Sequence, residues 1–179
     1  MTEVKVQSLG LDPSSNTPVV ILRETDGTRV LPIWIGPGEA RSIAMELAGM
    51  KFSRPLTHDL FATVIAGLGG TLKRVHITKV VDNTYYAELI IQRGNDLITV
   101  DARPSDSIAI ALRMEAPIFT SEELLERTAI EIAEAESGSF GGFGAGETET
   151  GGESGGLKAE ELKEYLRRMN PEDFGRFNP

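Results

Sequence analysis

The chain has 179 residues, no cysteine, and a net charge of −9 from 18 basic and 27 acidic side chains. This length suffices for one domain with a substantial core, and the lack of cysteine excludes disulfides and thiolate–metal sites. The acidic balance lacks the basic footprint of most nucleic-acid binders, so a phosphate-binding surface has to be local or rely on a divalent metal. With no apolar run long enough to span a bilayer and no signal peptide, we expect a soluble cytoplasmic protein.

The first part of the chain predicts three strands followed by a helix. Asp26-Gly27 favours a tight hairpin turn between two apolar runs. Pro32 cannot donate a hydrogen bond to a neighbouring strand, which favours an edge position or a bulge for its run. The strands are expected at 4–9, 19–24 and 29–35 and the helix at 40–49, with Glu39 in its first turn.

A polar motif at 54–60, RPLTHDL, begins the next predicted helix, and Thr57 is a plausible N-cap. One interpretation makes His58 and Asp59 exposed first-turn residues, and the other makes them part of a site. The helix also carries an apolar stripe formed by Leu60, Phe61, Val64, Ile65 and Leu68.

A second motif at 100–113, VDARPSDSIAIALR, passes from a β-run through a charged turn into an amphipathic helix. Pro104 suits the first helical turn, and Asp106 suits the positive end of the helix dipole. Arg103, like Arg54, stands before a proline that precedes a helix and an aspartate. An arginine fork matches carboxylate or phosphate geometry, so it could lock the loops internally or face a substrate phosphate.

The sequence also indicates an internal duplication. A shift of about 65 positions lays Ser42–Leu47 on Ser107–Leu112, and predicted strands precede each copy. We therefore predict an α+β fold in which two β-β-β-α-α units, at about 2–69 and 71–135, form one compact mixed-sheet domain over residues 1–136. The second set of strands is expected at 72–81, 85–93 and 97–100, with a last helix from Glu122.

The end of the chain differs in composition from the rest. Residues 137–156 are rich in Gly, Ser, Thr and Glu, which predicts a disordered linker. Residues 157–169 predict a linker-tethered amphipathic helix within a C-terminal segment at 157–179. One such helix is too short to be stable alone, so we expect it to dock on its own core, a neighbouring subunit or another protein.

The motifs at 54–60 and 100–113 together resemble the bifunctional nuclease domain family, and the run at 31–36, LPIWIG, fits that family too. The resemblance covers about residues 2–135. It implies a compact α+β domain that forms homo-oligomers, with nuclease activity on RNA and DNA attributed to the family through plant members. It implies no established set of catalytic residues.

The first functional hypothesis is a phosphodiesterase, in which carboxylates hold Mg²⁺ or Mn²⁺ and the metal activates water. It requires the two motifs to meet in space. It fails if the carboxylates lie far apart or are fully used by internal arginine pairing. The candidate metal ligands are Asp59, Asp101, Asp106 and Glu39, the general acid or base is His58, and the phosphate clamps are Arg54 and Arg103.

The second hypothesis is a non-catalytic homo-oligomeric module with a regulatory or scaffolding role. The polar motifs are then caps and arginine–aspartate locks, and the C-terminal helix recruits a partner. Deletion of 137–179 discriminates this hypothesis, because it should abolish function while the core stays folded. A small-molecule or nucleotide-binding role is the third possibility.

Overall fold

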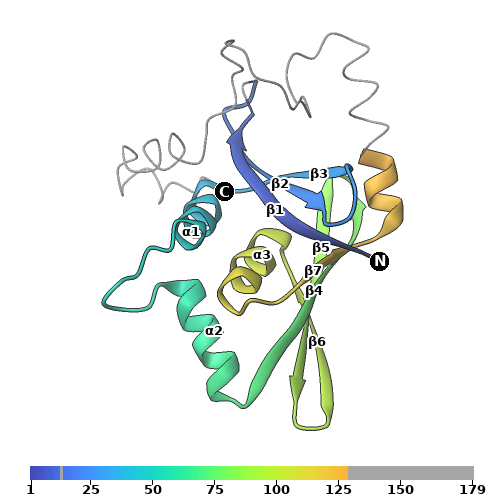
Figure 1. The fold of residues 1–179 in the computed structure, drawn as a ribbon. Coiled ribbons are helices and arrows are strands. Elements are labelled where there is room, and N and C mark those ends of the chain that lie inside the picture. The colour runs from blue at the N-terminus through green and yellow to red at the C-terminus, as the bar shows by residue number, and fades with distance from the viewer. Residues whose placement is uncertain (13, 129–179) are drawn as a thin grey trace.

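The computed structural model describes residues 1–12 and 14–128. Two successive runs of three strands are each followed by helical structure, and one short strand comes later in the chain (Figure 1). The elements are β1 (Thr2–Leu11), β2 (Pro18–Glu24), β3 (Val30–Trp34), α1 (Pro37–Leu47), α2 (Thr57–Gly67), β4 (Gly70–Val81), β5 (Thr84–Arg93), β6 (Asp96–Ala102), α3 (Pro104–Arg113) and β7 (Ile118–Thr120). Residues 122–128 are helical as well.

The seven strands form one mixed sheet in the order β3-β2-β1-β7-β4-β5-β6. The short strand β7 joins its two halves, because Ile118 pairs with Val4 of β1 on one side and with Val75 of β4 on the other. The β4–β7 pair is parallel and the remaining pairs are antiparallel. Pro32 lies in the edge strand β3, as the sequence predicts.

Helix α3 occupies the centre of the helical layer, where it contacts α1, α2, β4 and β5 (Figure 1). Seven of its ten residues are buried, including Ile108 and Ala109, which are fully buried. They belong to the same core as Val75 of β4 and Leu89 of β5. This burial fixes the start of α3, and with it the second polar motif, relative to both neighbouring helices.

Helix α2 differs from the sequence prediction in two ways. Leu56, not Thr57, is the N-cap residue, and its backbone N–H donates to the Asp59 side chain at 2.9 Å. Of the predicted apolar stripe only Ile65 is buried, because α2 reaches the core through one narrow side against α3 and β4. The rest of the stripe faces outward.

The α+β class and the mixed sheet are confirmed, whereas the internal duplication stays a prediction. The second run of strands leads into one helix and then into β7, a strand that was not among the predicted ones. The linker at 137–156 and the helix at 157–169 lie outside the described residues. Within the part of the chain that the structure describes, no helix is both long and apolar enough to cross a membrane.

Candidate functional site

The two polar motifs meet, and His58 of α2 connects them. Its Nδ1 lies 2.8 Å from Ser42 Oγ on α1, and its Nε2 lies 3.1 Å from Asp106 Oδ1 on α3. The ring is therefore fixed on both edges by side chains from two other helices. The imidazole is mostly enclosed, with 15% of its side chain exposed. We call Glu39, Ser42, His58, Arg103 and Asp106 the His58 cluster.

Arg103 closes this cluster on the solvent side. Its Nε donates to Asp106 Oδ2 at 2.8 Å, and its Nη2 donates to Glu39 Oε1 at 2.6 Å. Burial alone would raise the pKa of Asp106, but hydrogen bonds from Arg103 and His58 outweigh it and lower that pKa. The hydrogen bond with Asp106 likewise raises the pKa of Arg103. Both groups are therefore charged at neutral pH, and the guanidinium, 67% exposed, can also be reached by an anion.

A second ion pair lies beside the cluster and is more enclosed. Arg113 Nε donates to Asp59 Oδ1 at 2.5 Å, and only 5% of the Arg113 side chain is exposed. Arg113 also donates to the backbone oxygens of Ala109 and Ser42, at 2.9 and 3.3 Å. This arginine ties all three helices together, and its hydrogen bond is the main cause that lowers the pKa of Asp59.

Local sequence explains why these carboxylates lie close together. Each helix places an acidic residue third in its first turn: Glu39 in α1, Asp59 in α2 and Asp106 in α3. Acidic side chains are favourable there because the helix N-terminus is electropositive. Arg103 has the extended backbone (φ −70°, ψ 145°) typical of a residue before proline, and its side chain reaches back to the first turn of α3.

Two predicted site residues do not join the cluster. Asp101 is exposed on β6, where it pairs in register with Glu88 of β5. Arg54 is exposed in the connection before α2 and has no hydrogen bond or ion pair to the described residues. The structure thus brings together Glu39, His58, Arg103 and Asp106, with Asp59 adjacent through α2.

The carboxylates that meet are engaged by arginines. Arg103 lies between Glu39 and Asp106, and Arg113 holds Asp59. Over residues 1–12 and 14–128, no group of three or more His, Asp or Glu side chains is arranged to hold a metal ion. The donor set therefore does not fit a divalent cation in this arrangement, and the Mg²⁺ or Mn²⁺ site stays a prediction.

Ser42 and Arg113 were not among the predicted site residues. Arg113 ends the 100–113 motif, but its spacing from Asp59 gives no indication that the two meet. The sequence contained one indication for Ser42, because the predicted duplication aligns it with Ser107. Both serines are buried, and Ser107 Oγ has no hydrogen-bond partner in the described part of the chain. Their shared burial marks the inner side of α1 and α3.

Comparison with known proteins agrees with the family resemblance of the two motifs. The family model of the bifunctional nuclease domain matches residues 20–133. An uncharacterized protein of Mycobacterium tuberculosis is 42% identical over 174 residues, which cover 97% of this chain and 98% of the relative. Bifunctional nuclease 2 of Oryza sativa subsp. japonica is 30% identical over 122 residues, 66% of this chain and 38% of the relative. Bifunctional nuclease 1 of Arabidopsis thaliana is 27% identical with the same two coverages.

Proposed function

We propose that this chain, which belongs to the bifunctional nuclease domain family, is a nuclease that hydrolyses phosphodiester bonds of RNA or DNA. Two plant relatives carry the name bifunctional nuclease, and the similarity to them covers 66% of this chain. The family resemblance of the two motifs is thereby confirmed. The activity, its substrate and its residues are our proposal.

The meeting of His58, Asp106 and Arg103 is the observation that supports this proposal best. Imidazole changes its protonation between pH 5 and 8, which suits it to transfer a proton at neutral pH. Asp106 orients the ring through its contact with His58 Nε2. Arg103 offers an exposed guanidinium beside them, which fits a phosphate oxygen pair and the negative charge that develops on it.

The metal ligands remain a separate part of the proposal. A bound Mg²⁺ or Mn²⁺ would supply an activated water and charge neutralisation. Glu39, Asp59 and Asp106 would first have to exchange their arginine partners for the ion, so the roles above are assigned without it.

The test is a cleavage assay on single-stranded RNA and DNA, with Mg²⁺, Mn²⁺ or EDTA, on variants whose fold is verified by circular dichroism. General acid–base catalysis contributes about 10²- to 10⁴-fold, so we expect His58→Ala and Asp106→Asn to lose at least about 10²-fold in rate. Arg103→Ala should lose activity through weaker phosphate binding. Asp101→Asn is the matched control, because Asp101 is acidic and lies outside the cluster.

Activity that survives His58→Ala would contradict the assignment. Loss of cleavage activity in Asp101→Asn would indicate that the active site lies near the end of β6. Loss of activity only when EDTA is added would support a role for a divalent metal.

A second candidate function is a non-catalytic module with regulatory or scaffolding properties. The observation that favours it is the internal pairing of the polar motifs, since Arg103 and Arg113 each hold their carboxylates without any ligand. In that case His58 and the arginines lock three helices together. Deletion of 137–179 would then abolish function while the core stays folded, and His58→Ala would alter stability alone.

Self-association belongs to the proposal in either case. Five large apolar side chains project from α2 and its two ends: Leu56 (37% exposed), Leu60 (52%), Phe61 (47%), Val64 (47%) and Leu68 (68%). Leu56, Leu60, Val64 and Leu68 are spaced four residues apart, so they lie along one face of the helix. A contiguous apolar face of this kind marks an interaction site, and a second copy supplies the same face.

A further inference from the structure

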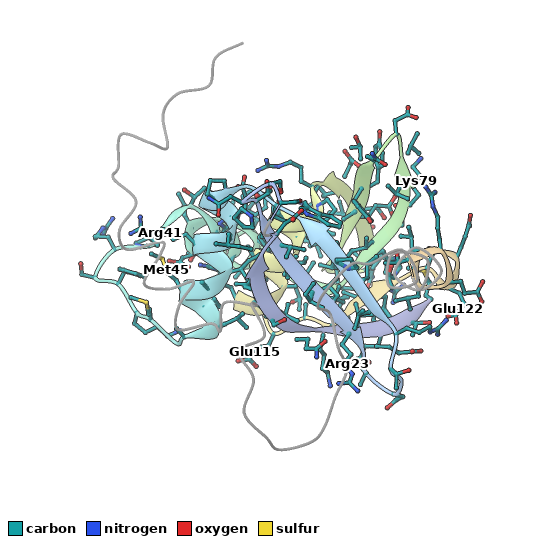
Figure 2. All side chains as sticks on the ribbon, turned by 90° about the horizontal axis from the view of Figure 1, so that it is seen from above. Arg23, Arg41, Met45, Lys79, Glu115 and Glu122 are labelled. Atoms are coloured by element: carbon teal, nitrogen blue, oxygen red, sulfur yellow. The ribbon has the colours of Figure 1, made fainter. Side chains whose placement is uncertain are left out.

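A pocket of about 350 Å³ lies between the end of β3, the β4–β5 hairpin and the helical residues 122–128. Its walls include Trp34, Asn83, Tyr85, Leu124, Arg127 and Thr128. None of these residues belongs to the His58 cluster. The helix that begins at Glu122 lies on the opposite side of the molecule from Arg41 and Met45 of α1 (Figures 1 and 2). The volume is in the range of small-molecule sites.

Trp34 supplies an exposed aromatic face to this pocket. It is the single tryptophan of the chain, and 51% of it is exposed. Its indole N–H donates to Asp12 Oδ2 at 3.0 Å, so the polar edge of the ring is satisfied and the ring faces remain apolar. Hydrogen bonds from Ser14 and Trp34 hold the pKa of Asp12 far below its ordinary value, so the charged carboxylate keeps the indole in place at neutral pH.

Two polar side chains of the pocket, Asn83 and Arg127, could bind the other parts of a nucleotide stacked on Trp34. The Asn83 amide carries both donors and acceptors, which can pair with the edge of a nucleobase. The Arg127 guanidinium is suited to a phosphate. A fixed and exposed aromatic face combined with a cation is the arrangement on which nucleic-acid bases stack in single-strand binding proteins.

We infer that this pocket binds one nucleotide, with its base stacked on Trp34, its base edge at Asn83 and its phosphate toward Arg127. The nucleotide is either a free mononucleotide or one residue of a single strand, and only the second source rests on the proposed nuclease function. A nucleotide stacked on Trp34 would anchor a single strand at a point outside the His58 cluster.

The experiment uses the full chain and its own fluorescence, because every tryptophan photon comes from Trp34. Adenosine 5′-monophosphate, adenosine and ribose 5-phosphate are titrated separately while the emission is recorded. We expect saturable quenching by the two ligands that carry a base and none by ribose 5-phosphate. Competition of adenosine 5′-monophosphate by a short single-stranded RNA then distinguishes a strand from a free nucleotide as the source.

Three variants test the contacts, with binding of adenosine 5′-monophosphate followed by equilibrium dialysis. Stacking on an aromatic side chain contributes about 1–3 kcal/mol per base, so Trp34→Ala should weaken binding by about 5- to 150-fold, and Trp34→Phe should retain most of it. Tyr86→Ala is the matched control, because Tyr86 is an exposed aromatic residue (38%) outside the pocket. Its binding should equal that of the wild type.

The inference is overturned if no base-bearing ligand quenches the emission saturably, if ribose 5-phosphate quenches it equally, or if Trp34→Ala binds like the wild type. A mononucleotide has no internucleotide bond to cleave, so its binding does not depend on catalysis. Binding without cleavage would refute only the proposed nuclease function, and cleavage without binding would refute only this inference.

Discussion

The ion pair between Asp59 and Arg113 is the residue-scale feature with the clearest energetic consequence. The guanidinium is almost fully enclosed, and it joins α1, α2 and α3 through three hydrogen-bond acceptors. Its Nε also lies 3.9 Å from Glu46 Oε2 on α1. Loss of one partner would leave a charge with little access to water, and the breaking of a buried pair costs about 3–5 kcal/mol. This arginine therefore stabilises the framework on which the His58 cluster is built.

We predict that Asp59→Asn lowers the free energy of unfolding by about 3 kcal/mol at pH 7, the lower end of the range for a buried pair, because the Asp59 side chain is 30% exposed. Urea denaturation followed by circular dichroism measures this change. Asp101→Asn removes an exposed carboxylate that lies outside both ion pairs, so it should change the stability by less than about 0.5 kcal/mol. Equal stability of the two variants would contradict the assigned role of the pair.

Asp59→Asn should also change how the free energy of unfolding responds to acid. The pKa of Asp59 in the folded protein lies below its ordinary value of 3.8, so folding favours the ionised carboxylate. Its stabilisation is complete above about pH 5 and is lost as the pH falls through the folded pKa. The wild type should therefore lose more stability than Asp59→Asn between pH 5 and pH 3. Asp106, whose pKa is also lowered, should contribute a further acid-sensitive part in both proteins.

At the scale of elements, helices α1, α2 and α3 end in the same way but with different residues. Gly49, Gly69 and Glu115 follow the C-caps of α1, α2 and α3, and all three have positive φ, at 62°, 76° and 52°. Glycine adopts this left-handed conformation without steric cost, whereas other residues lose about 1–2 kcal/mol there. Glu115 is exposed at the surface, and the end of α3 therefore retains backbone strain (Figure 2).

We predict opposite effects from two substitutions at this equivalent position. Gly69→Ala should lower the free energy of unfolding by about 1 kcal/mol, because alanine is strained at φ 76°. Glu115→Gly should raise it by about 0.5 kcal/mol, since relief of strain exceeds the added freedom of the unfolded chain. Chemical denaturation of both variants measures the two changes. Effects of the same sign would show that the left-handed geometry does not determine the stability here.

How much of the fold could be predicted at this scale depends on which structural property each sequence pattern encodes. Turn-forming Gly and Pro residues together with the periodicity of apolar residues were sufficient to predict β1 to β6, helices α1 to α3 and the helix that begins at Glu122. Pro32 was expected at an edge or a bulge, and it lies on an edge strand. The apolar stripe of α2 was predicted, but the spacing of apolar residues does not indicate whether another element covers them. The three residues of β7 were too few to show a period, although they join the two halves of the sheet.

Most residues of the site could be predicted from the sequence, but their contacts with one another could not. His58, Asp106, Arg103 and Glu39 follow from helix-start chemistry, because each stands at or beside an N-terminal turn. Their mutual pairing depends on how α3 sits between its neighbours, a tertiary property that local spacing does not contain. For the same reason, the sequence could not show that Asp101, five residues before Asp106, lies outside the cluster.

At the scale of the whole molecule, the apolar face of α2 has to be reconciled with the overall charge. Two copies that each carry −9 repel one another, so association is favoured at a surface that contains few carboxylates. Residues 60–72 contain no charged side chain, and four of the five exposed apolar residues of this face lie among them. The α2 face is thus the described surface that is best suited to a second copy of the chain.

We predict a homo-oligomer in sedimentation velocity at about 50 µM, and a monomer for the double variant Leu60→Glu/Val64→Glu, because four buried carboxylates at a two-fold interface are too costly to desolvate. Leu97→Glu is the matched control, since Leu97 is equally exposed (58%) but lies on β6. Higher salt should strengthen association, because the Debye length falls from about 10 Å at 0.1 M to about 3 Å at 1 M and screens the repulsion. A monomeric wild type, or dissociation of the Leu97 variant alone, would exclude α2 as the interface. Weaker association at high salt would instead indicate that ion pairs hold the copies together.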